Sequence, residues 1–262
     1  MFHWLTERRR RHLLEQPFPA AWAEIVEREV PMVRRLDPAL HGRLRELVQV
    51  FVHEKHWEGC GGQVLGDEHR VVIAAQACLL LVGVNNHDLF AEAVSILVYP
   101  STVVIPRRTH GMFELPPTAP EQETAILGQA FKRGAVIIAW DRAAAGARDV
   151  DGRGNVVLHE LAHEIDMYDG PADGTPPLAS ARERRAWLAA CEPAFLALRA
   201  ATERGEPAFL DAYGATNEAE FFAVATEAYF TRPGELAEAM PALFAVLRDF
   251  YRVELAPRSA RR

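Results

Sequence analysis

Cysteine is scarce in this chain of 262 residues. The three cysteines, Cys60, Cys78 and Cys191, lie far apart and form no Cys-x-x-Cys pair. A disulfide framework needs cysteines that can pair, and a thiolate metal site needs closely spaced ones. The sequence therefore argues against both classes and favours a reducing compartment.

Long apolar runs and an excess of positive charge are lacking too. Apolar runs such as Ala77–Val84 are too short to span a bilayer, and Met1–Gln16 has no stretch resembling a signal peptide. The net charge of -7 at pH 7 gives no overall attraction for nucleic acid. The short basic runs Arg8–Arg11 and Arg258–Arg262 are interpreted as solvated ends. We expect a cytoplasmic protein that binds neither membranes nor nucleic acid directly.

The apolar pattern predicts many helices and one small sheet. Helices are expected at Pro19–Glu58 (with breaks), Arg70–Val84, Ala181–Arg204, Asn217–Phe230 and Ala237–Tyr251. Short strands are expected at Ala93–Val98, Thr102–Ile105 and Gly134–Asp141. Ala143–Gly154 is expected to be a linker. The class is α+β, with one domain over 19–255, a flexible segment at 1–18 and a disordered basic tail at 256–262.

The clearest chemical signal is the run His159-Glu160-Leu161-Ala162-His163, on a helix predicted to be capped by Asn155 and to run to about Tyr168. Histidines four residues apart lie on one helix face, one turn apart. That spacing lets one Zn²⁺ bind two imidazole nitrogens, and Glu160 lies beside them as a candidate general base. The motif therefore predicts a zinc-dependent hydrolase.

A catalytic zinc needs a third protein ligand and an open position. Asp169 follows His163 by six residues, but that short-spaced layout requires a glycine that is absent here. A predicted helix further along the chain carries Glu220 and Glu227, seven residues apart on one face. Glu220 could instead form a capping box with Asn217, and Glu227 could be a solvated helix residue. The residues alone favour Glu220 over Glu227 and leave Asp169 as a weaker alternative.

Several different distinctive segments are spread along nearly the whole chain, from Trp22 to Tyr251. They are Glu54-Lys55-x-Trp57-Glu58-Gly59, Arg70-Val71-x-Ile73-Ala74-Ala75-Gln76-Ala77-Cys78-Leu79-Leu80, Val136–Asp141, Asn155–Asp166, Asp211-Ala212-Tyr213 and Glu220-Phe221-Phe222-Ala223-Val224. On these segments the chain resembles the Mlc titration factor A family of bacterial zinc metallopeptidases. The resemblance implies a helix-rich, zincin-like fold with a small mixed β-sheet over the HExxH helix and a catalytic core similar to that of the anthrax lethal factor.

The resemblance also implies roles for particular residues. One Zn²⁺ per chain would be held by His159, His163 and Glu220, with Glu160 as the catalytic glutamate and Tyr213 near the zinc as a hydrogen-bond donor. The implied activity is aminopeptidase-like hydrolysis of small peptide substrates. An Mlc-like transcriptional repressor of sugar uptake is the implied partner. The alternative is a repressor-binding protein in which peptidase activity is secondary.

Three further groups of residues invite functional interpretations. Asp166 shares the face of the histidines and is expected to accept the outer N–H of one of them, although it could instead bond the following turn. A predicted strand is expected to pair with an extended substrate, and it contains Val136, Ile137, Ile138 and Ala139. His53 and His56 have a spacing that could bind a metal, but we interpret them as ordinary helix surface.

Overall fold

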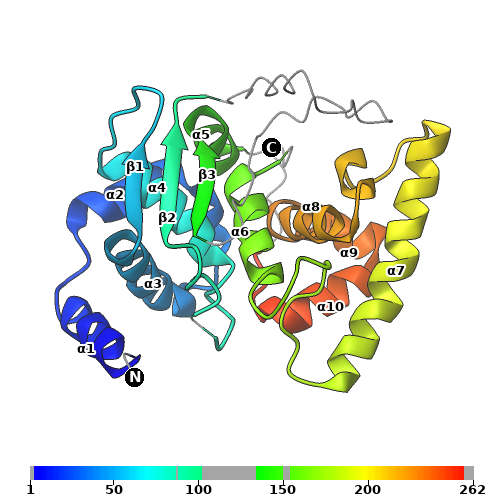
Figure 1. Cartoon of the computed structure of the whole chain (residues 1–262), viewed down its shortest axis with the longest axis horizontal. Coiled ribbons are helices and arrows are strands. Elements are labelled where there is room, and N and C mark those ends of the chain that lie inside the picture. The colour runs from blue at the N-terminus through cyan, green and yellow to red at the C-terminus, as the bar shows by residue number, and fades with distance from the viewer. Residues whose placement is uncertain (1–2, 87, 102–133, 150–153, 257–262) are drawn as a thin grey trace, which may run out of the picture.

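The computed structural model describes residues 3–86, 88–101, 134–149 and 154–256 (Figure 1). The helices are α1 (His3–Leu14), α2 (Ala20–Glu29), α3 (His41–Glu54), α4 (Asp67–Leu79), α5 (Trp140–Arg148), α6 (Val156–Asp166), α7 (Ala181–Arg204), α8 (Glu218–Thr231), α9 (Pro233–Ala239) and α10 (Pro241–Tyr251). Short 3-10 turns are η1 (Pro31–Arg35), η2 (Pro38–Leu40) and η3 (Ala212–Ala215). The strands are β1 (His56–Gly59), β2 (Ser95–Tyr99) and β3 (Ala135–Ala139). The expected helix-rich α+β class is confirmed.

The three described strands form one sheet in the order β1-β2-β3, and both pairings are parallel. Ser95 pairs with His56 on one side and with Ala135 on the other. The antiparallel strand that a mixed sheet requires is therefore not among the described residues. The strand expected at Thr102–Ile105 lies outside them. In the described sheet β3 is an end strand.

Helix α4 forms the centre of the core, as its apolar sequence predicts. Every residue from Val71 to Leu79 is buried, and the helix packs against α2, α3, α5 and α6. Burying large aliphatic side chains contributes about 1.5–3 kcal/mol each, which makes such a helix a major source of stability. The α4 core thus provides a rigid support for α6.

Helix α6, which carries the histidine motif, lies between two parts of the molecule. On one side it contacts β3, α4 and α5, and on the other it packs against α8. Figure 1 shows α6 in the middle, with the sheet on one side and α7–α10 on the other. Side chains on α6 can therefore meet residues from both parts.

Among the elements that differ from the sequence prediction are β1, α5 and the predicted helix Ala237–Tyr251, which is divided between α9 and α10. Strand β1 lies at the end of a segment predicted as helix, because His56–Gly59 gains a full set of pairing partners in β2. Helix α5 occupies much of the predicted linker Ala143–Gly154, and its Ala143 and Ala147 are buried. Small residues that indicate a flexible linker also allow a helix to pack closely, so composition alone misassigned this segment.

The N-terminal segment includes a helix. Arg10 on α1 donates to Glu54 at 2.7 Å and to Asp88 at 3.0 Å, so this part of residues 1–18 contacts the body. The domain limits of 19–255 stay a prediction, and residues 257–262 lie outside the described ones. Among the described helices, none combines the length and the apolar character that a membrane span requires.

Candidate metal centre

The start of α6 is fixed by Asn155, as the sequence predicts. Its backbone is extended, and its side-chain oxygen accepts a hydrogen bond from the N–H of Leu158 at 3.0 Å. The helix then carries His159 and His163 on one face, with ring centroids 4.9 Å apart. This local geometry presents both imidazoles in the same direction.

Helix α8 brings a carboxylate to the two histidines. Glu220 Oε2 lies 3.0 Å from His159 Nε2 and 3.4 Å from His163 Nε2. Donor atoms that share one tetrahedral zinc at about 2.0–2.1 Å are separated by roughly 3.3 Å, so this spacing fits a zinc ion. Within the described part of the chain, this is the one group of three histidine, cysteine or acidic side chains close enough to hold a metal.

Glu160 lies next to the cluster with an unused acceptor. Its side chain is 2% exposed, and its Oε2 has no hydrogen-bond partner among the described residues. Burial raises the pKa of Glu160 to about 7, although the charges of His159 and His163 oppose the shift. An unsatisfied buried carboxylate oxygen costs stability, so its presence here points to a chemical role. The donor set and this oxygen together fit a catalytic metal site.

The charges within the cluster balance one another. Burial alone would raise the pKa of Glu220, but its bonds to His159 and His163 outweigh burial and lower the pKa to about 2. Burial alone would lower the pKa of His159, but its bonds to Glu220 and Glu227 outweigh burial and raise it to about 10. Both ring nitrogens of His159 thus face carboxylate oxygens, and a metal ion could bind Nε2 only when that nitrogen carries no proton.

Glu227 contacts the outer side of His159. Its Oε1 lies 2.7 Å from Nδ1 of His159, and its Oε2 accepts from the backbone N–H of Asn155 at 2.5 Å. Glu227 is therefore placed to orient a histidine rather than to bind the metal. Such outer carboxylates fix the ring orientation and raise the basicity of a metal-binding histidine.

Within the described residues, Asp166 bonds the loop after α6 and neither histidine of the cluster. Its carboxylate accepts backbone N–H bonds from Asp173, Gly174 and Thr175 at 3.2, 3.0 and 3.0 Å. Asp166 is the last residue of α6, so its side chain reaches the turn that follows, which is the alternative interpretation. The carboxylate at His159 Nδ1 is Glu227 instead. Asp166 holds the loop after α6.

That loop is fixed on two further sides. Trp187 of α7 donates its indole N–H to the carbonyl of Gly174 at 3.1 Å. Gly174 has a φ of 76°, and a Cβ at this position would lie 2.4 Å from the carbonyl oxygen of Glu218. Only glycine fits this conformation and this close approach without strain. The loop is therefore packed against the first residue of α8.

Tyr213, in η3, borders the cluster. Its hydroxyl donates to Glu220 Oε1 at 3.3 Å, and its ring lies 5.9 Å from that of His159. Partial burial, with the charge of Glu220 adding to it, raises the pKa of Tyr213 to about 12. The hydroxyl thus keeps its proton at neutral pH and can act as a hydrogen-bond donor.

The other expected residues are not members of the cluster. All four strand residues, Val136, Ile137, Ile138 and Ala139, have buried side chains in β3, and pairing with a substrate stays a prediction. Asp169 is exposed and outside the cluster. His53 bonds the Gln49 carbonyl at 2.8 Å and packs against Trp22, while His56 is exposed.

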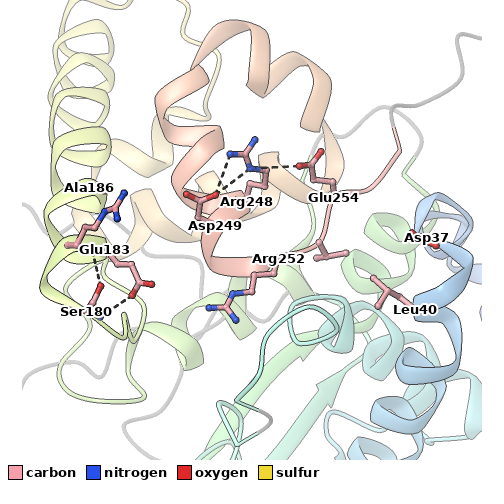
Figure 2. Close-up of a pocket in the computed structure, with 11 residues that line it drawn as sticks. Asp37, Leu40, Ser180, Glu183, Ala186, Arg248, Asp249, Arg252 and Glu254 are labelled. Carbon is pink, nitrogen blue, oxygen red and sulfur yellow. Dashed lines mark hydrogen bonds and ion pairs between the residues drawn. The ribbon is translucent and has the colours of Figure 1, made fainter.

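A separate cavity of about 940 Å³ lies between the start of α7 and the end of α10 (Figure 2). No residue of the histidine cluster lines it. Arg248 forms ion pairs with Asp249 and Glu254, and Glu183 bonds Ser180, so much of the lining charge is internally paired. This cavity therefore adds nothing to the metal centre.

Comparisons with known proteins bear on the same site. The sequence profile of the family described as "Glucose-regulated metallo-peptidase M90" matches residues 4–252. An uncharacterized protein of Synechocystis sp. is 34% identical over 253 residues, covering 96% of this chain and 90% of that protein. Mlc titration factor A of Klebsiella pneumoniae is 30% identical, covering 85% and 82%. Mlc titration factor A of Serratia proteamaculans is 30% identical, covering 89% and 87%.

Proposed function

The chain belongs to the M90 metallopeptidase family, that of Mlc titration factor A, and we propose that it hydrolyses peptides with one zinc ion held by His159, His163 and Glu220. One observation carries the proposal: three donor atoms from α6 and α8 converge, and the adjacent Glu160 of α6 has a buried oxygen with no partner in the described part of the chain. Two imidazoles and one carboxylate form a known ligand set of catalytic zinc, which leaves a fourth position open.

Each residue around the metal has a distinct task in this proposal. When bound, zinc would supply Lewis acidity, making water a stronger acid and polarising the scissile carbonyl. Glu160 takes the proton of the attacking water and passes it to the leaving amine. Burial raises the pKa of Glu160, which makes this carboxylate a stronger base than an exposed one.

Tyr213 is proposed to donate a hydrogen bond to the oxyanion that forms on the substrate. Tyr213→Phe should lower kcat by about 10²–10³, the usual effect of losing one such donor. Zinc affinity should change little, because the metal ligands remain. Initial rates of hydrolysis at saturating substrate measure kcat, and competition with a chelator measures zinc affinity. The matched control is Tyr168→Phe, which alters a tyrosine of similar exposure outside the cluster. Equal kcat values for Tyr213→Phe and wild type would remove Tyr213 from the mechanism.

The proposed substrates are small peptides, cleaved in an aminopeptidase-like manner by a cytoplasmic enzyme. An extended substrate would pair with the backbone of β3, which is an end strand of the described sheet. Metal analysis of the purified protein, with hydrolysis of free and N-blocked peptides, tests the proposal. Retention of one zinc by a His159→Ala/His163→Ala protein would contradict it.

A second proposed role is binding of an Mlc-like transcriptional repressor. The support is that several relatives at about 30% identity are called Mlc titration factor A. Because a binding surface is separable from the chemistry, Glu160→Gln should capture the partner as well as wild type does. The measurement is a pull-down from host lysate with both proteins. Recovery of no DNA-binding protein by either bait would count against this role.

A further inference from the structure

Gln76 is a polar residue within an apolar helix, and the mechanism above does not use it. It lies in the distinctive Ala-Ala-Gln-Ala-Cys run of α4 and is 0% exposed. Its neighbours from Val71 to Leu79 are all buried. A buried amide destabilises a protein unless its groups are bonded, so packing alone does not account for glutamine here.

The hydrogen bonds of Gln76 fix its orientation. Its Nε2 donates to the carbonyls of Val72 at 3.0 Å and Ala143 at 3.3 Å. Its Oε1 accepts from Nδ2 of Asn155 at 2.8 Å. Both ends of the amide are thereby used, and α4 is linked to the residue that begins α6.

Asn155 in turn holds His159 by two routes. Its carbonyl accepts from the backbone N–H of His159 at 3.0 Å. Its own N–H donates to Glu227 Oε2 at 2.5 Å, and Glu227 Oε1 lies 2.7 Å from His159 Nδ1. The three residues form a closed ring of hydrogen bonds behind the metal-facing nitrogen of His159. A shift of Asn155 would move both the backbone and the ring of that histidine.

We infer that Gln76 is a positioning residue for the metal centre, acting on His159 through Asn155 and Glu227. The inference rests on the proposed zinc site. The side chain of Asn155 has two duties, since its oxygen caps Leu158 and its amide nitrogen bonds Gln76. Gln76 thus selects the side-chain orientation in which the Asn155 oxygen caps α6, and this cap holds the backbone of Asn155 on which the ring closes.

Gln76→Met tests the inference, with Gln49→Met as the matched control. Gln49 is also a buried glutamine that donates to two carbonyls, those of Leu13 and Gln16, but it lies away from the site. Gln76→Met should weaken zinc binding about 10-fold, the lower end for loss of an outer partner. It should also alter the visible spectrum of bound Co²⁺, which reports coordination geometry. Gln49→Met should leave both at wild-type values.

Asn155→Ser provides a second variant, because serine keeps the cap and loses the bond to Gln76. It should weaken zinc binding to a similar degree, and the double variant should bind no more weakly than either single one. The inference would be overturned if both single variants kept the wild-type zinc affinity and Co²⁺ spectrum. It would also be overturned if Gln49→Met lost as much zinc affinity as Gln76→Met does, or if the losses of the two single variants added up in the double variant. Failure of wild type to bind either metal would instead refute the proposed function.

Discussion

Glu160→Gln should lower kcat by about 10²–10⁴ while zinc remains bound, because the variant removes the proposed general base and keeps all three proposed ligands. Glutamine has nearly the same volume as glutamate, so the packing around this buried position should survive. Hydrolysis assays measure kcat, metal analysis measures the bound zinc, and circular dichroism shows whether the fold survives. A variant that hydrolysed substrate as fast as wild type would show that another group takes the proton.

The same substitution should change the pH dependence of stability in the metal-free protein. Burial raises the pKa of Glu160 from 4.5 to about 7, so the folded state binds more protons than the unfolded state between these values. Stability is therefore lost as the pH rises through this window. The glutamine introduced by Glu160→Gln cannot ionise, so the variant does not lose this stability as the pH rises. The free energy of unfolding of the variant should therefore exceed that of wild type by more at pH 8 than at pH 5. Urea titrations at both pH values measure it.

Glu220→Gln should have the second large effect, a loss of zinc affinity well beyond the 10- to 100-fold typical of outer residues. A neutral amide would replace the charged ligand, and the dication would keep only two imidazoles. The fold should survive, since Asn217 caps α8 by accepting from the backbone N–H of Glu220 at 2.9 Å. A weakened cap costs at most about 0.5 kcal/mol here. Chelator competition measures the zinc affinity of the variant, and circular dichroism shows whether it is folded.

Two controls give this prediction its specificity. Glu227→Gln should weaken zinc binding about 10- to 100-fold, because Glu227 contacts His159 but not the metal position. Asp169→Asn should bind as wild type does, because Asp169 is exposed and outside the cluster. Normal binding by Glu220→Gln together with a larger loss in either control would overturn the ligand assignment.

Local patterns predicted much of this molecule. The capping asparagines at positions 155 and 217 begin α6 and α8 as expected, and Ala181–Arg204 is the predicted helix. Histidine spacing on a helix predicted that His159 and His163 share a face, because only local geometry is involved. Glu220 was harder to identify from the residues, since its approach to His159 spans 61 residues.

Contacts between distant segments explain what the sequence did not predict. Gln76 and Asn155 are 79 residues apart, and no local pattern indicates that their amides meet. Glu227 was considered as a ligand, but its contact with His159 depends on how α8 lies against α6. Asp166 shares a face with the histidines on an ideal helix, yet as a terminal residue it bonds the backbone beyond. The carboxylate at the outer nitrogen of His159 therefore comes from α8 and not from α6, because tertiary packing brings Glu227 to that nitrogen.

The position of Gly174 has a consequence for mutagenesis of the loop that contains it. Residues 170–172 are exposed, whereas Gly174 touches the backbone of Glu218, two residues before Glu220. Any larger side chain at position 174 would push on the start of α8 and move Glu220 with it. A mutant library of this loop should therefore randomise 170–172 and keep 173–175 constant. The library would then vary the surface of the loop without displacing Glu220.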